Sequence, residues 1–189
     1  MIKAIVFDCY GVLVRDGWIP FRERYFGHDL ELTQQAIEAG RRVDAGLSSY
    51  GDFIHEMAEM AGVSDEQARS EIESNPRNTE LLDKIRDELK PKYKIGILSN
   101  AASDIMSELF APEQAALFDE VVVSYRIGVV KPAAAAYQAV AERLGVEVSE
   151  CLFIDDQLHY CQAAEVIGMQ AIQYQDNIRL AIMLKKYNI

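Results

Sequence analysis

A small set of polar residues has the types and positions needed for chemistry on an anionic or electron-poor substrate. Most of them come just after short apolar runs: Asp8, Tyr10, Ser99, Asn100, Asp155 and Asp156. Lys131 stands directly before Pro132, where a proline readily opens a helix. Carboxylates can act as nucleophiles, proton carriers or ligands of a hard cation, and an ammonium group can neutralise negative charge. These residues therefore form the candidate site.

The charges of this set favour a bound metal ion. Without a cation, Asp8, Asp155 and Asp156 against Lys131 would present about two negative charges to an anionic substrate, and each like-charge pair about 4 Å apart costs on the order of 4 kcal/mol at an effective dielectric of 20. A divalent cation would bring that sum to about zero. We therefore predict a metal-dependent enzyme.

The elements that must position these residues can be predicted from apolar periodicity. Short apolar runs at residues 2–7, 94–98, 121–123, 151–154 and 170–173 suit strands that are buried on both faces. Two of the connections repeat apolar residues at helical spacing: Ala102, Ile105, Met106 and Leu109, then Tyr137, Val140, Ala141 and Leu144. This alternation predicts an α/β fold, a Rossmann-like parallel sheet flanked by helices, with ligands at the carboxyl ends of the strands.

The first connection is too long for a single helix and predicts an insertion. About 80 residues separate the first two apolar runs, where one helix would suffice. Within them, Tyr50, Phe53, Ile54 and Met57 share one helical face, and residues 64–67, SDEQ, read as a capping box that opens another helix. We expect a core domain of residues 1–14 and 81–189 and a helical cap domain of residues 15–80, set over the strand ends.

Composition excludes several classes of protein. The net charge of -11 repels nucleic acid and anionic membranes. No segment approaches the roughly 20 apolar residues that cross a bilayer, and the first residues lack the features of a signal peptide, so we expect a cytoplasmic protein. Three cysteines without paired spacing indicate reduced thiols rather than disulfides or a zinc site.

Several motifs in order resemble a known family. The stretches FDCYGVL, ILSNA, GVVKPAAAAYQAVAERLGV and FIDDQLHYCQAAEVIGMQAI are similar to those of the haloacid dehalogenase superfamily of hydrolases, in the subgroup with a helical cap inserted after the first strand. The resemblance spans nearly the whole predicted core and is weak only in the cap. It implies a hydrolase, and it specifies the substrate much less closely.

The resemblance also implies roles for the candidate residues. Asp8 would be the nucleophile and form an aspartyl intermediate that water hydrolyses. Ser99, Asn100 and the backbone amides that follow would hold the transferring group, and Lys131 would neutralise charge on Asp8 and the substrate.

The same resemblance implies a Mg²⁺ site. Asp155 and Asp156 would hold the ion together with Asp8 and the backbone carbonyl of Tyr10, because this hard ion prefers oxygen ligands. The cofactor that we expect is therefore Mg²⁺.

Tyr10 departs from the pattern of most phosphatases in the superfamily. They carry a second aspartate at this position as general acid and base, whereas the metal-independent dehalogenase branch carries tyrosine. The paired Asp155 and Asp156 differ from that branch and favour a Mg²⁺-dependent phosphatase. Three outcomes of the missing aspartate stay open. The enzyme is slow, it acts only on substrates with good leaving groups, or a residue of the cap donates the proton. A metal-independent 2-haloacid dehalogenase and a domain that only binds a phosphorylated metabolite are the alternatives.

The predicted cap offers one further candidate and a hint about the substrate. Arg41 could grip a substrate carboxylate or phosphate, or could simply be a solvated residue of a helix face. Residues 15–85 contain 15 acidic and 8 basic side chains, a balance that attracts no polyanion. We expect a small anionic metabolite as the substrate, with neither nucleic acid nor membrane as a partner.

Overall fold

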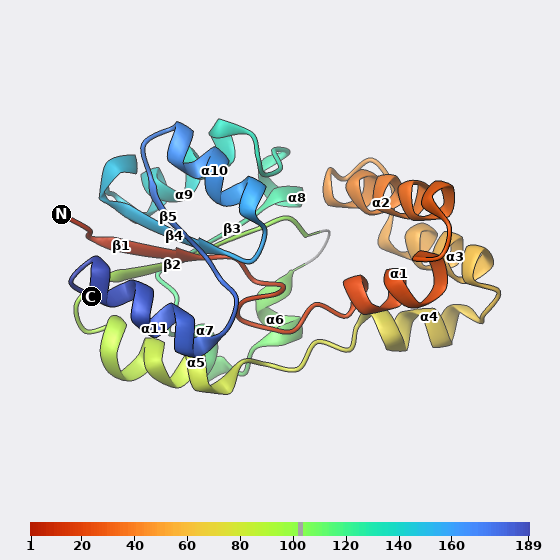
Figure 1. Cartoon of the computed structure of the whole chain (residues 1–189), viewed down its shortest axis with the longest axis horizontal. Helices are drawn as coiled ribbons and strands as arrows, with labels where there is room; N and C mark the ends of the chain where they lie inside the picture. The colour runs from red at the N-terminus through yellow and green to blue at the C-terminus, as the bar shows by residue number, and fades with distance from the viewer. Residues whose placement is uncertain (102–103) are drawn as a thin grey trace.

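A five-stranded parallel sheet forms the centre of the molecule. The computed structural model describes residues 1–101 and 104–189. The strands are β1 (Ala4–Phe7), β2 (Lys94–Ser99), β3 (Glu120–Val123), β4 (Cys151–Asp155) and β5 (Gln170–Gln173). They lie in the order β3-β2-β1-β4-β5, and every neighbouring pair is parallel (Figure 1). This confirms the predicted α/β fold.

The helices differ in length and in position around the sheet. Those between the first two strands are α1 (Trp18–Phe26), α2 (Leu30–Asp44), α3 (Tyr50–Ala61), α4 (Asp65–Ile72) and α5 (Thr79–Lys84), which continues as a π-helical turn (Ile85–Leu89). The later ones are α6 (Ile105–Leu109), α7 (Pro112–Ala115), α8 (Ser124–Ile127), α9 (Ala134–Leu144), a 3₁₀ turn (Val148–Glu150), α10 (Leu158–Val166) and α11 (Asn177–Lys186). Ala102, part of the predicted helical pattern before β3, lies outside the described residues.

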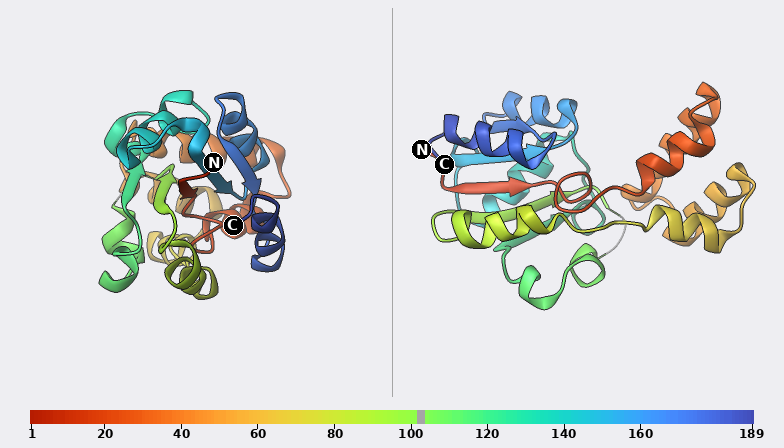
Figure 2. Two further views of the ribbon diagram at one scale, coloured as in Figure 1. Left: turned by 90° about the vertical axis from the view of Figure 1, so that its left-hand side faces the viewer. Right: turned by 60° about the horizontal axis from the view of Figure 1, so that its bottom comes forward.

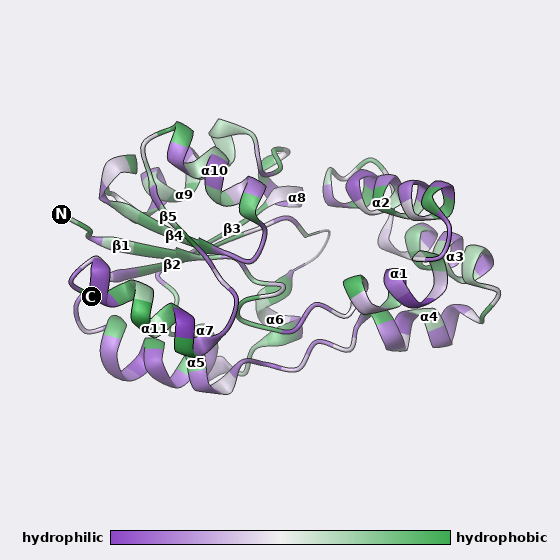
Figure 3. Ribbon diagram, in the orientation of Figure 1, coloured by the Kyte–Doolittle hydropathy of each residue, from purple (hydrophilic) through white to green (hydrophobic). Residues whose placement is uncertain are grey.

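Helices cover both faces of the sheet. Successive residues of a strand point to opposite sides, so an apolar strand makes both faces apolar. In β1, Ile5 and Phe7 join a cluster that α5, α6 and α11 cover, whereas Ala4 and Val6 join a second cluster beneath α9 and α10. Figure 2 shows these layers from two further directions. In Figure 3 the middle of the sheet is hydrophobic, polar residues lie at several strand ends, and the helices are banded, as expected for a sheet covered on both faces.

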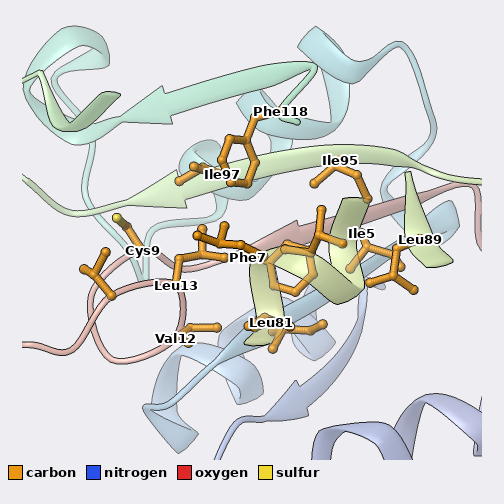
Figure 4. Close-up of a cluster of buried hydrophobic side chains, with 14 of the residues drawn as sticks. Ile5, Phe7, Cys9, Val12, Leu13, Leu81, Leu89, Ile95, Ile97 and Phe118 are labelled. Atoms are coloured by element: carbon orange, nitrogen blue, oxygen red, sulfur yellow. The ribbon is translucent and has the colours of Figure 1, made fainter. Parts of the chain in front are cut away.

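The first of these clusters lies under the loop that follows β1. In Figure 4, Phe7 lies among side chains from β2 and α5, and Cys9, Val12 and Leu13 extend the cluster beyond the strand end. Cys9 and the other two cysteines, Cys151 and Cys161, are free thiols and buried, which agrees with the expected reduced state. The apolar packing around Cys9 fixes the chain on either side of Asp8.

Helices α1 to α4 pack around a hydrophobic cluster of their own, at the end of the sheet where the strands terminate (Figure 1). The buried face of α3 contains the predicted Phe53, Ile54 and Met57. We call these four helices the cap, and the domain limits given above stay a prediction. Two chain segments join the cap to the core, and they are tied to each other through a bond from Arg15 N to the Pro76 carbonyl at 2.9 Å.

Two local predictions need correction. The Ser64 hydroxyl accepts from Gln67 N at 3.2 Å, but the Gln67 side chain bonds to Tyr25 and Glu71, so only half of the expected capping box forms. Pro132 does not open a helix: its peptide bond with Lys131 is cis, and α9 begins two residues later, at Ala134.

Within the described ranges 1–101 and 104–189, no helix combines the length and the apolar character required to span a membrane.

Candidate active site

The carboxyl ends of β1 and β4 bring the predicted acidic residues together. Asp8 directly follows β1, and its backbone N–H donates to the Ile154 carbonyl at 2.8 Å, so the two strand ends stay aligned. Oxygens of Asp8, Asp155 and Asp156 all lie within 4.8 Å of one another. Residues from opposite ends of the sequence therefore form one acidic cluster.

Lys131 lies inside this cluster. Its Nζ is 2.8 Å from Asp8 Oδ1 and 2.7 Å from Asp155 Oδ2, and only 1% of its side chain is exposed. The two neighbouring carboxylates raise the pKa of Lys131 above its ordinary value even though burial alone would lower it. The lysine is therefore a fixed positive charge between two carboxylates.

The side chain of Asn100 holds the backbone of Lys131. Lys131 N donates to Asn100 Oδ1 at 2.8 Å, and Asn100 Nδ2 donates to the Lys131 carbonyl at 3.1 Å. The amide is thus occupied by the segment that carries the lysine. The structure assigns Asn100 a positioning contact that the sequence did not indicate, and its predicted contact with substrate stays a prediction.

The acidic cluster fits a hard divalent cation. Asp156 Oδ1 is buried and has no hydrogen-bond partner among the described residues. Gly11, at φ +89°, lets the backbone pass close to this carboxylate: a Cβ there would lie 2.7 Å from Asp156 Oδ2. The site thus offers three carboxylates. One of their oxygens has no partner among the described residues and lies next to Gly11, which has no side chain. Mg²⁺ commonly binds at sites of this kind.

The pKa values of the cluster agree with that fit. Burial, together with the charges of Asp155 and Asp156, raises the pKa of Asp8 to about 8 despite the opposing effect of Lys131. Burial and Asp155 raise the pKa of Asp156 to about 6. One lysine does not offset three buried carboxylates, and a cation bound among them would favour their ionised forms.

Ser99 and the residues after it occupy the end of β2. The Ser99 hydroxyl is buried and lacks a hydrogen-bond partner within the described ranges, so it is available to a ligand. The next amide that was predicted to hold the transferring group, Ala101 N, instead donates to Ser124 Oγ at 3.1 Å. The amide of Ala102 falls outside the residues that the structure describes.

Sequence comparison gives this arrangement a family. Residues 2–168 match the family model described as haloacid dehalogenase-like hydrolase. The chain belongs to the haloacid dehalogenase-like hydrolases. It is 32% identical over 200 aligned residues to Phosphatase MT3486 of Mycobacterium tuberculosis (strain CDC 1551 / Oshkosh), an alignment that covers 90% of this chain and 86% of the relative.

Solved structures of this hydrolase family include similar chains. The HAD family enzyme bt-2542 of Bacteroides thetaiotaomicron is 26% identical, with a TM-score of 0.73 and coverage of 95% of this chain and 98% of that one. A structure of the same enzyme in complex with magnesium and inorganic phosphate has 26% identity, a TM-score of 0.71 and coverage of 95% and 99%. The chain thus resembles a family member that holds both ions.

Tyr10, the departure from the phosphatase pattern, lies at the junction of core and cap. Its side chain packs against the core cluster, and Tyr50 of α3 and Glu108 of α6 are among the groups that affect it electrostatically. Burial raises the pKa of Tyr10 well above its ordinary value. The phenol therefore stays protonated at neutral pH and is a poor proton carrier.

Arg41 is not brought to the acidic cluster. It lies in α2 with 74% of its side chain exposed and pairs with Glu38 at 3.7 Å. In the described part of the chain, no contact joins its guanidinium to Asp8 or Lys131. The placement matches the solvated helix face that was the alternative reading of this residue.

Two residues near this hydrolase site, Ser124 and Tyr160, were not predicted to contribute to it. Ser124 directly follows β3, a polar residue at a strand end that could have been found in the sequence, and its hydroxyl accepts from Ala101 N and donates to the Asp44 carbonyl. The ring of Tyr160 lies 4.8 Å from Lys131 Nζ, an arrangement that favours the cation. Its position on the first turn of α10 was visible in the sequence, but its contact with Lys131 depends on the fold.

Proposed function

We propose that this hydrolase is a Mg²⁺-dependent phosphatase that acts on a small phosphorylated metabolite through an aspartyl-phosphate at Asp8. The observation that carries the proposal is the largely buried cluster of Asp8, Asp155 and Asp156 around Lys131, in which one carboxylate oxygen has no hydrogen-bond partner among the described residues. The magnesium and phosphate complex of the enzyme bt-2542 supports it, as does the similarity to a phosphatase.

The proposed reaction assigns each residue a task. Asp8 attacks phosphorus and displaces the leaving group, and a water molecule then attacks the same phosphorus and restores the carboxylate. Lys131 holds Asp8 in place and offsets negative charge on the phosphoryl group. The Ser99 hydroxyl, which has no partner among the described residues, donates to a phosphoryl oxygen, and Asn100 keeps Lys131 in position.

The metal has a defined place in this proposal. Asp8, Asp155, Asp156 and the Tyr10 backbone carbonyl would hold Mg²⁺, which supplies positive charge beside the transferring phosphoryl group. Asp155 also accepts from Gln157 N at 2.8 Å and from Lys131, so its carboxylate is fixed in orientation. The oxygen most available to the ion is Oδ1 of Asp156.

The experiment that tests the function joins turnover with binding of a phosphoryl mimic. We expect hydrolysis of small phosphomonoesters or acyl phosphates with Mg²⁺, and rates at background after EDTA treatment. Beryllium fluoride with Mg²⁺ should raise the melting temperature of the wild type by roughly 5–10 °C at about 100 times its dissociation constant. Asp8→Asn protein is the control and should show no such shift. Turnover that EDTA leaves unchanged would contradict the proposal.

Gly11→Ala tests the metal position through the backbone. The new Cβ would lie 2.7 Å from the Asp156 carboxylate, so we expect weaker Mg²⁺ binding, measured by isothermal titration calorimetry. The matched control is Gly46→Ala, because Gly46 also has a positive φ of +72° but has nothing within 4 Å of a Cβ. Both variants should carry about 1–2 kcal/mol of backbone strain, and only the first should lose metal affinity. Equal Mg²⁺ affinities in the two variants would count against a site at Asp156.

Tyr10 favours a second candidate, a metal-independent 2-haloacid dehalogenase. In that reaction Asp8 attacks carbon and releases halide, which needs no proton from position 10. The test is halide release from 2-haloacids by chelator-treated protein. We expect no halide release, because the buried carboxylates repel the anionic 2-haloacid substrate when no cation is bound. Release without metal would instead favour the dehalogenase.

A further inference from the structure

The last residue of α2, Asp44, connects the cap to the candidate site. Figure 1 shows α2 running back toward the core, so that its C-terminal end faces α8. Ser124 Oγ, at the start of α8, donates to the Asp44 carbonyl at 2.8 Å and accepts from Ala101 N at 3.1 Å. Ala101 adjoins Asn100, whose side chain holds Lys131. A short series of contacts therefore places Asp44 above the end of β2.

The carboxyl group of Asp44 is free to act on a ligand. It is half-buried and makes no hydrogen bond or ion pair with any residue that the structure describes. The charged groups that face it are Lys131 of the core and Asp16 of the segment leading into the cap, and its charge also reaches Tyr160 of α10.

The surroundings of Asp44 suit a group that exchanges protons near neutral pH. Burial raises its pKa to about 7, and Asp16 adds to that rise while Lys131 opposes it. The C-terminal end of a helix also disfavours negative charge. A carboxyl with such a pKa is a more effective general acid and base at neutral pH than one with an ordinary pKa.

The other candidates for proton transfer are less suitable. Tyr10 stays protonated and lies beside Tyr50. Asp16 accepts from Trp18 N at 2.8 Å and also bonds to the amide of Ile19, so its carboxylate caps the start of α1. Among the residues that the structure describes, Asp44 combines an electrostatic interaction with Lys131 and a carboxyl group that makes no hydrogen bond or ion pair.

We propose that Asp44 is the general acid and base of the phosphatase reaction and takes the role that an aspartate at position 10 would otherwise have. The proposal rests on the proposed function. In the first step Asp8 forms a bond to phosphorus, the bond from phosphorus to the leaving oxygen breaks, and Asp44 gives its proton to that oxygen. In the second step Asp44 takes a proton from water as the water oxygen bonds to phosphorus, the bond to Asp8 breaks, and phosphate leaves.

The two steps predict a kinetic pattern for Asp44→Asn that a structural role would not produce. With p-nitrophenyl phosphate the leaving group needs little protonation, so the first step should survive, whereas the second step loses its base. We expect a burst of about one nitrophenolate per active site, followed by turnover about 10²- to 10⁴-fold slower than wild type. The aspartyl-phosphate should accumulate and be seen by mass spectrometry of acid-quenched protein. With phenyl phosphate, a poorer leaving group, the burst itself should be slow.

The matched control is Glu38→Gln, which removes the same charge from an exposed position of the same helix. It should keep wild-type rates and show no burst. Folding of the Asp44→Asn protein can be checked by its melting temperature above pH 7, which should not fall, because ionised Asp44 is unfavourable in the folded protein there.

The outcomes separate this inference from the proposed function. If the wild type hydrolyses no aryl phosphate with Mg²⁺, the proposed function fails and the role of Asp44 fails with it. If the wild type is active and Asp44→Asn has the same rate, the function stands and the role of Asp44 is wrong. The same conclusion follows if Asp44→Asn turns over slowly and shows no burst. A burst in Asp44→Asn that is absent from Glu38→Gln supports the role.

Discussion

Replacing Asp8 with asparagine should lower phosphatase turnover by about 10⁴-fold or more, because an amide cannot form the aspartyl-phosphate. Loss of an attacking group removes the covalent route altogether, so substrate affinity should change far less than the turnover number. The measurement is steady-state hydrolysis of a phosphomonoester by both proteins in the presence of Mg²⁺. Equal rates would exclude Asp8 as the nucleophile.

The fold should tolerate this replacement, which separates catalysis from stability. Burial raises the pKa of Asp8 from its ordinary value of 3.8 to about 8, so the stability associated with this group is present at low pH and lost as pH rises through about 8. Asparagine carries no charge at any pH. In metal-free protein, the free energy of unfolding of Asp8→Asn should therefore equal or exceed that of the wild type at about pH 9. A clear loss there would mean that an ionised Asp8 stabilises the fold.

Replacing Lys131 with methionine should abolish measurable turnover and also destabilise the protein by about 3–5 kcal/mol, because it leaves Asp8 and Asp155 buried without their cation. The loss should depend on pH. Asp8 can protonate as pH falls, so the difference from the wild type should be smallest near pH 5 and should grow as pH rises through the pKa of Asp8, about 8. Denaturant unfolding of the metal-free proteins at several pH values measures this.

A matched control for this variant exists on the surface. Lys90 pairs with Asp119 at 2.6 Å, with 30% and 39% of the two side chains exposed. Lys90→Met should change stability by about 1 kcal/mol or less, because water screens an exposed ion pair. Comparable losses in the two variants would contradict the view that Lys131 compensates buried charge.

Much of the core could be predicted because its strands are buried on both faces. Such strands read as continuous apolar runs, and the predicted run at 151–154 forms all of β4 except its last residue, Asp155. The predicted run at 94–98 stops one residue short of β2, because Ser99 is polar yet still pairs with Val123 in the sheet. In a parallel sheet the carboxyl ends of all strands lie at one edge. The proximity of Asp8, Asp155 and Asp156 could therefore be predicted from the topology.

The rest of the site depends on packing between distant segments, which single-chain patterns do not report. Asn100 and Lys131 lie 31 positions apart. The oxygen and the nitrogen of the Asn100 side-chain amide both bond to the backbone of Lys131. Ser124 and Asp44 lie 80 positions apart and meet because the cap docks on the core. The electrostatic effect of the cap residue Tyr50 on Tyr10 likewise arises only in the folded protein. The sequence showed the departure at position 10, whereas the candidate that replaces it became visible only in three dimensions.

The central position of β1 affects how the chain assembles during synthesis. Its two neighbours in the sheet, β2 and β4, begin at Lys94 and Cys151, so the first strand emerges from the ribosome long before either partner exists. Helices α1 to α4 form a continuous stretch of sequence with its own apolar cluster and can pack while the nascent chain is still growing. We expect the N-terminal strand to stay unpaired until about half of the chain has been made, and Asp8 to meet Asp155 and Asp156 only after most of it has been made.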